Sequence, residues 1–174
     1  MVVLPNDPWP NGVTTPWDGF IGYLLLDALI GNTDRHHQNW GVLVRREDSA
    51  SMRELAPSFD HASSLGRELT DADRVHRLTT PDSGGNVRAY VARGRSAFYD
   101  EVGHTLTPEA AFAAAASRSP SAGRAWLRRL GMVTPAACEK FVSRVPGPRM
   151  SDAARRFALA FLKETRTRLE ALVV

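Results

Sequence analysis

The segment 17–30 has apolar residues at helical spacing. It carries two apolar stripes: Phe20, Leu24 and Ala28 form one, and Ile21, Leu25 and Leu29 form the other. Because apolar residues cover most sides of this segment, we expect a central, buried helix. Gly31 and Asn32 tolerate a left-handed backbone and are expected to end it. Residues 31–39 then form a polar loop.

A β-hairpin is predicted directly after this loop. Residues 40–46 are rich in β-branched and apolar side chains and indicate a strand, residues 47–52 a turn, and residues 53–56 a short return strand closed by Pro57. Residues 1–16 contain four prolines and little periodicity, so we expect an extended lead-in there.

The C-terminal part is predicted to be helical. Three helices begin with a hydroxyl residue followed by proline, at Thr107-Pro108, Ser119-Pro120 and Thr134-Pro135. A hydroxyl at the N-cap satisfies a free amide, and proline at the first helical position loses no hydrogen bond. A last helix is expected from Ser151 to about Leu172. Residues 61–104 are harder to assign, with a helical turn or loop expected at 63–66 and a flexible loop at 82–86. The predicted fold is mostly α with a small β-hairpin.

Composition places the chain among globular proteins. It has 174 residues, 43% of them apolar and 24% charged, which is close to the average for soluble domains. The longest apolar run, residues 20–30, is shorter than the roughly 20 residues that a membrane-spanning helix needs. The first residues lack the basic and apolar regions of a secretory leader. We therefore expect a cytoplasmic protein that does not interact with membranes. A single cysteine, Cys138, excludes an internal disulfide framework.

Charge is distributed unevenly along the chain. The first 101 residues carry 14 acidic and 10 basic side chains, whereas the remaining residues carry 5 and 12. A basic C-terminal part could attract nucleic acid. We favour arginines spread over the exposed faces of helices, and so expect no direct nucleic-acid binding.

The polar loop carries the candidate chemistry. Asp34 precedes Asn39 by five positions, and Asp60 follows beyond the predicted hairpin. This order is typical of protein-kinase-like phosphotransferases, in which a catalytic aspartate is followed by an asparagine and a second aspartate that hold magnesium. Magnesium prefers oxygen ligands, and one carboxylate with one neutral amide suits it. We expect Asp34 to orient or accept the proton of the attacking hydroxyl.

Two segments resemble the C-terminal lobe of HipA-type serine/threonine kinases. They are Asn-Thr-Asp-Arg-His-His-Gln-Asn at 32–39 and Leu-Ala-Pro-Ser-Phe-Asp-His at 55–61. That family belongs to a wider protein-kinase-like group that includes the phosphatidylinositol 3/4-kinases. The resemblance covers residues 17–66 well and the later helices only in general character. It implies residues 17–174 as the lobe, with 17–66 as its catalytic and metal-binding segment and 105–174 as a helical subdomain.

The resemblance also implies an activity. By it, Asp34 is the catalytic aspartate, His36 supports the loop, and Asn39 and Asp60 are the cofactor-binding residues that hold Mg²⁺. ATP would be the phosphoryl donor and a Ser/Thr hydroxyl of a protein substrate the acceptor. Members of the family are often toxin components paired with a DNA-binding antitoxin, so an antitoxin-like partner is expected.

One departure from the family concerns the nucleotide-clamping small lobe. Only 33 residues precede Asp34 and none of them is lysine; the two lysines are Lys140 and Lys163. We therefore expect the large lobe with the small lobe absent. Three explanations stay open: the chain is a fragment, a separate small-lobe chain completes it, or catalysis has been lost.

Two other functions remain as alternatives. A kinase remnant could act as a non-catalytic protein-interaction module, which the missing lysine supports. A metal-dependent phosphohydrolase could instead use His36, His37 and His61 with Asp34. Asp27, a charge inside an apolar helix, is costly unless paired. Either it orients the loop, for example by pairing with Arg35, or its face of the helix stays solvated.

Overall fold

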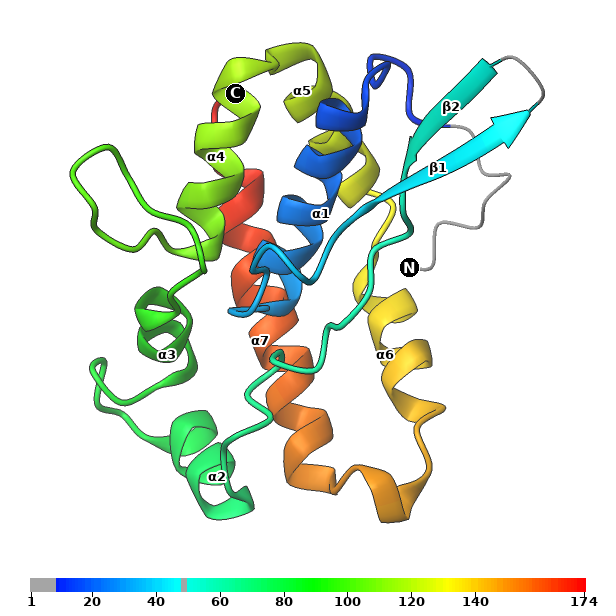
Figure 1. Ribbon diagram of the computed structural model, residues 1–174. Coiled ribbons are helices and arrows are strands. Elements are labelled where there is room, and N and C mark those ends of the chain that lie inside the picture. The colour runs from blue at the N-terminus through cyan, green and yellow to red at the C-terminus, as the bar shows by residue number, and fades with distance from the viewer. Residues whose placement is uncertain (1–8, 48–49) are drawn as a thin grey trace.

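The structure is a computed structural model that describes residues 9–47 and 50–174. It contains seven α-helices and a hairpin within these residues (Figure 1). The elements are α1 (Pro16–Ile30), β1 (Val42–Glu47), β2 (Ala50–Leu55), α2 (Asp71–Thr79), α3 (Val87–Arg93), α4 (Pro108–Arg118), α5 (Pro120–Leu130), α6 (Pro135–Ser143), a 3₁₀ turn (Gly147–Arg149) and α7 (Asp152–Glu170). The expectation of a mostly helical fold with one small hairpin is confirmed.

Helix α1 lies at the centre of the molecule, as its apolar pattern predicts. It packs against α4, α5 and α7, and Figure 1 shows it enclosed by these helices. Most of the buried core comes from α1, α4 and α5, with Leu169 of α7 and Val13 of the lead-in. The helix ends at Gly31, whose left-handed backbone (φ 65°, ψ 38°) sends the chain into the polar loop. The loop is therefore fixed to the most buried element of the fold.

The start of α1 depends on Asp18. Its carboxylate accepts hydrogen bonds from the Thr14 and Thr15 amides at 3.1 and 3.0 Å and from the Ser119 hydroxyl at 2.7 Å. Burial by itself would raise the pKa of Asp18, but the hydrogen bonds from Ser119, Thr14 and Thr15 outweigh it and lower the pKa from 3.8 to about 2. The ionised form of Asp18 thus stabilises the folded state.

Replacing Asp18 by asparagine should lower the free energy of unfolding at pH 7 by about 2 kcal/mol, the value of the pKa shift. Because the folded pKa is the lower one, this stabilisation is present above about pH 4 and is lost as the pH falls towards 2. Urea denaturation between pH 7 and pH 2 should show the wild type and the variant converging. As a control, Asp152→Asn, at an exposed acid of α7, should change the value at pH 7 by less than about 0.5 kcal/mol.

The hairpin pairs β1 with β2 in an antiparallel register from Val42 opposite Leu55 to Glu47 opposite Ala50. The sequence predicts a turn over residues 47–52 and a return strand only from residue 53. That prediction is wrong, because pairing continues to Ala50 and shortens the connection. Small and polar residues suggested a loop there, but ladder hydrogen bonds depend on the partner strand rather than on local propensity. Residues 48–49 of the predicted turn, and residues 1–8 of the lead-in, lie outside the described residues.

Two helices, α2 and α3, form where the sequence shows no clear periodicity. Neither contains a buried residue, and at nine and seven residues each is too short for more than a brief helical repeat of apolar positions. Their signals are caps. Thr70 and Asp73 form a capping box at α2, and the Asn86 side chain accepts from the Ala89 amide at the start of α3. No helix was assigned over 61–104 from the sequence, and the caps are the signals that could have revealed α2 and α3.

The three hydroxyl–proline helix starts are confirmed at α4, α5 and α6. At α5, however, the capping role is different. Ser119 makes no side-chain cap bond, and its hydroxyl donates to Asp18. The last helix ends at Glu170, slightly before the predicted end, and buries Phe157, Phe161, Thr165 and Leu169 along one side. None of the described helices combines the length and apolar character needed to span a membrane.

Candidate functional site

The polar loop after α1 is tied back to the helix by Asn32. This residue is almost fully buried. Its amide nitrogen Nδ2 donates to Asp27 Oδ1 at 2.8 Å, and its Oδ1 accepts from the Asp34 backbone amide at 3.2 Å. Sequence reasoning used Asn32 only as a helix end. Its side chain also sets the position of the backbone at Asp34.

Asp27 and Arg35 form a buried ion pair. Arg35 Nε and Nη2 donate to the two carboxylate oxygens of Asp27 at 2.8 and 2.7 Å, and the two residues are only 1% and 3% exposed. This is a two-point contact between a planar guanidinium and a carboxylate, which fixes direction as well as distance. Of the two interpretations of Asp27, pairing with Arg35 is confirmed.

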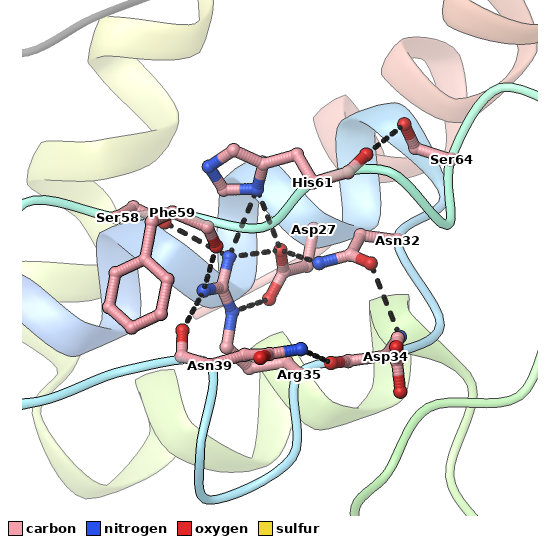
Figure 2. A network of polar contacts seen from close by, with 9 residues as sticks. All are labelled: Asp27, Asn32, Asp34, Arg35, Asn39, Ser58, Phe59, His61 and Ser64. Atoms are coloured by element: carbon pink, nitrogen blue, oxygen red, sulfur yellow. Dashed lines mark hydrogen bonds and ion pairs between the residues drawn. The ribbon is translucent and has the colours of Figure 1, made fainter.

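The same guanidinium reaches the segment that follows the hairpin. Nη1 donates to the backbone oxygens of Asn39 at 2.5 Å and Phe59 at 3.2 Å. Nη2 lies 3.0 Å from Ser58 Oγ and 3.2 Å from His61 Nδ1. Figure 2 shows Arg35 surrounded by these groups. One arginine therefore joins α1, the polar loop and residues 58–61, which are distant in sequence.

His61 also contacts this guanidinium. Its Nδ1 lies 3.2 Å from Arg35 Nη2, and since arginine offers only donors, a hydrogen bond between these two atoms has Nδ1 as its acceptor. Arg35, Ser58 and His61 are site residues that sequence reasoning did not place in one network. The available signals were a charge within an apolar helix and an arginine directly after Asp34.

Asp34 and Asn39 are connected directly. Asn39 Nδ2 donates to the backbone oxygen of Asp34 at 2.6 Å, and Asn39 is only 4% exposed. This bond occupies the nitrogen of the amide, so the oxygen is the part of Asn39 that can bind a cation. The side chain of Asp34 is half exposed, and in Figure 2 its carboxylate points away from the Asp27–Arg35 pair.

His36 lies beside the Asp34 carboxylate. Its Nδ1 accepts from the Gln38 backbone amide at 3.2 Å, which leaves the proton of a neutral ring on Nε2. That Nε2 is 3.7 Å from Asp34 Oδ1, beyond hydrogen-bond distance but close enough for electrostatic attraction. The residue that anchors the loop is the buried Arg35, whereas His36 is partly exposed and contacts the loop at its surface.

Asp60 is held between two anchored neighbours. The Phe59 carbonyl and the His61 ring both contact Arg35. Asp60 itself is exposed and has a left-handed backbone (φ 54°). Aspartate and asparagine accept this conformation better than most residues, and such backbones concentrate at functional sites. The described contacts bring its backbone near the Asn39 end of the loop, and its role as a metal ligand stays a prediction.

The donor set at this site fits magnesium rather than a transition metal. It offers the Asn39 amide oxygen and the Asp60 carboxylate, both hard oxygen ligands. Within residues 9–47 and 50–174, no group of three or more His, Cys, Asp or Glu side chains is placed to hold a metal. The phosphohydrolase alternative, which needs a histidine cluster, gains no support from the described side chains.

Comparison with known proteins finds similarity to a kinase, in part of its sequence and in its fold. No protein family model matches the chain. Its sequence is 40% identical over 55 residues to the serine/threonine-protein kinase CtkA of Helicobacter pylori (strain J99 / ATCC 700824), a match that spans 32% of this chain and 15% of that protein. The crystal structure of the H. pylori proinflammatory kinase CtkA superposes with a TM-score of 0.69 at 23% identity.

The chain has the fold of part of a kinase. The superposition covers 91% of this chain and 55% of the CtkA chain, so this chain spans about half the length of the solved kinase. The expected large-lobe architecture is confirmed at the level of the fold.

Proposed function

We propose that the chain is a HipA-like kinase domain that transfers the γ-phosphoryl group of ATP to a serine or threonine hydroxyl. The observation that carries the proposal is the bond from Asn39 Nδ2 to the Asp34 backbone oxygen, within a loop that Arg35 ties to the segment around Asp60. This bond fixes the orientation of the Asn39 amide, whose oxygen is the proposed cation ligand. The serine/threonine kinase similarity gives the reaction class.

In this proposal Asp34 is the catalytic residue. Its half-exposed carboxylate orients the acceptor hydroxyl and takes its proton as the oxygen attacks phosphorus. His36 is a positioning residue, because its Nε2 faces the Asp34 carboxylate at 3.7 Å and limits the directions that this carboxylate can adopt. Arg35 fixes the position of the loop that carries Asp34 and His36 relative to the segment around Asp60.

Asn39 and Asp60 are the residues that would hold Mg²⁺ and, through it, ATP. Magnesium supplies neutralisation of phosphate charge, which lowers the barrier to transfer. The chain's contribution is to present one amide oxygen and one carboxylate from segments that a single guanidinium connects. Because the guanidinium of Arg35 connects these segments, the two ligands can move little relative to each other. The site then needs little rearrangement before phosphoryl transfer.

A separate small-lobe chain or segment is part of the proposal. The hairpin and its neighbours expose apolar side chains: Trp40, Val42, Leu43, Val44 and Phe59 are each at least 38% exposed. Exposed apolar side chains in and beside one hairpin favour a contact surface. In the matched kinase 45% of the length lies outside the superposition, and a lobe of this kind is the proposed partner of that surface. The proposal also includes a toxin role with an antitoxin-like partner. This part rests only on the resemblance to HipA-type kinases.

Calorimetry and phosphoryl transfer test the proposal together. The chain, supplied with the small lobe that the proposal includes, should release or absorb heat when ATP is added with Mg²⁺ and much less when the metal is chelated. Incubation with γ-labelled ATP and a mixture of serine-containing peptides should label the peptides. If the chain with its small lobe binds no ATP with Mg²⁺ and labels nothing, it is the non-catalytic interaction module and the kinase proposal is wrong.

A further inference from the structure

A cavity of about 500 Å³ lies beside the candidate site. It is bordered by the C-terminal end of α1, by α3, by the start of α4 and by α7. Thr33, which precedes Asp34, lines the cavity, as do Ser63 and Ser64 from the segment after Asp60. The Thr33 amide donates to the Ser63 carbonyl at 3.2 Å. The cavity therefore begins where the two halves of the candidate site meet.

Three arginines line this cavity: Arg77, Arg93 and Arg95. Each guanidinium donates to a backbone carbonyl oxygen, at 3.3, 2.8 and 2.9 Å respectively. Across the described part of the chain, none of the three forms an ion pair with a carboxylate within 4.0 Å. Backbone carbonyls orient these groups but do not neutralise their charge, so the cavity wall carries positive charge.

The two acids in the cavity wall do not cancel this charge fully. Glu109 Oε2 forms an ion pair with Arg168 Nε at 2.7 Å. Glu68 accepts a hydrogen bond from the Tyr90 hydroxyl. Burial and this bond to Glu68 raise the pKa of Tyr90, so its hydroxyl stays neutral and does not oppose an anion. Three cations thus face one carboxylate that is not already ion-paired.

Arg77 has unused hydrogen-bonding capacity. Its guanidinium stacks over the Tyr90 ring with its carbon 4.7 Å from the ring centre. Its Nε atom is buried and has no hydrogen-bond partner among the described residues. A buried donor without an acceptor is costly, so an arriving anion that draws this guanidinium into a new contact would lower the energy.

We propose that this cavity binds an anionic side chain of the acceptor peptide, close in sequence to the hydroxyl that is phosphorylated. The inference rests on the proposed function, since it takes Asp34 as the place of transfer. A carboxylate and a phosphoserine share the required chemistry. Phe161 and Val91 add apolar wall, which accommodates the methylene groups or the backbone of such a peptide.

The test is fluorescence anisotropy with three labelled peptides, binding to the full chain without nucleotide. Each peptide contains one serine, flanked by glutamate, by phosphoserine or by lysine. We expect the two anionic peptides to bind about 10-fold more tightly than the lysine peptide, with a difference that shrinks as the salt concentration rises. The order of the two anionic peptides separates carboxylate from phosphate recognition.

Charge reversal supplies the decisive variant. Arg93→Glu with Arg95→Glu changes two exposed cavity residues and should reverse the preference towards the lysine peptide by a similar factor. A matched control is Arg118→Glu with Arg128→Glu, which makes the same change of charge on exposed residues that do not line this cavity. The control should keep the preference for the anionic peptides.

Two results would overturn the inference. One is equal binding of all three peptides, or no binding of any. The other is loss of preference in the control pair as large as in the cavity pair, which would reveal an unspecific charge effect. Phosphorylation of the same peptides is measured in parallel. If the chain prefers the anionic peptides but phosphorylates none, the kinase proposal is contradicted and the anion site is retained. If the chain phosphorylates the peptides without preferring the anionic ones, only the anion site is rejected.

Discussion

Replacing Arg35 by alanine should lower the free energy of unfolding by about 3–5 kcal/mol, the range for breaking a buried ion pair. The variant leaves the Asp27 carboxylate buried with only the Asn32 amide as a side-chain hydrogen-bond partner among the contacts described. It also removes the donors that hold the Asn39 and Phe59 carbonyl oxygens. Denaturation in urea at pH 7 measures the loss. As a control, Arg156→Ala breaks an exposed pair with Asp152 and should cost less than about 1 kcal/mol.

A double variant separates stability from positioning. Asp27→Leu with Arg35→Met removes both charges together, and apolar side chains of similar volume often replace a buried pair without loss of stability. We expect the double variant to be more stable than Arg35→Ala. Its phosphoryl transfer should still fall sharply, because no guanidinium then connects the polar loop to residues 58–61. If Arg35→Ala instead lowers the free energy of unfolding by less than about 1 kcal/mol, the network does not hold the loop in place.

Sequence alone predicted the elements whose signals are local. The apolar stripes of α1 and the threonine–proline starts of α4 and α6 lie within a few residues of what they determine. Helices α2 and α3 are short and have no buried residue, so their apolar spacing extends over too few positions to identify a helix. Ser119 has the right residue type for a cap, yet its hydroxyl donates to Asp18, about one hundred residues away in the chain.

In the candidate site, too, local features could be predicted from the sequence and long-range contacts could not. Asp34, Asn39 and Asp60 could be proposed from type and spacing, because kinase-like chemistry requires those groups in that order. The network that positions them could not be derived, since Arg35 contacts residues 58, 59 and 61 across the hairpin. Such contacts depend on where the hairpin returns the chain. The left-handed backbone of Asp60 is likewise a result of the fold and has no signal in the neighbouring residues.

Phosphoryl transfer should fall by at least about 1,000-fold in Asp34→Asn, because the variant removes the group that orients the hydroxyl and takes its proton. Stability should hardly change. The Asp34 side chain is half exposed, and His36 Nε2 lies 3.7 Å from its Oδ1. We expect a melting temperature within about 2 °C of the wild type, since exposed pairs contribute little. Transfer from γ-labelled ATP and a thermal melt are the two measurements.

Asp60→Asn extends this prediction and distinguishes the two acids. Asparagine is the suitable replacement because it also tolerates the left-handed backbone at this position (φ 54°), whereas alanine would add strain. Both variants should lose transfer, but for different reasons. Asp34→Asn should keep the magnesium-dependent heat of ATP binding, since Asp34 is proposed to act on the hydroxyl. Asp60→Asn should lose that heat, since it removes a carboxylate proposed to hold the metal.

The control for both variants is Asp152→Asn, which changes an exposed acid of α7 and should alter neither transfer nor ATP binding. Transfer within about tenfold of the wild type in either site variant would contradict its proposed role. A fall of more than about 10 °C in melting temperature in both would show instead that the two carboxylates are structural. The more informative result is a difference between the two variants in ATP binding. A structural acid would affect binding and transfer together. Loss of transfer without loss of binding in Asp34→Asn alone requires that Asp34 acts on the hydroxyl and Asp60 on the metal.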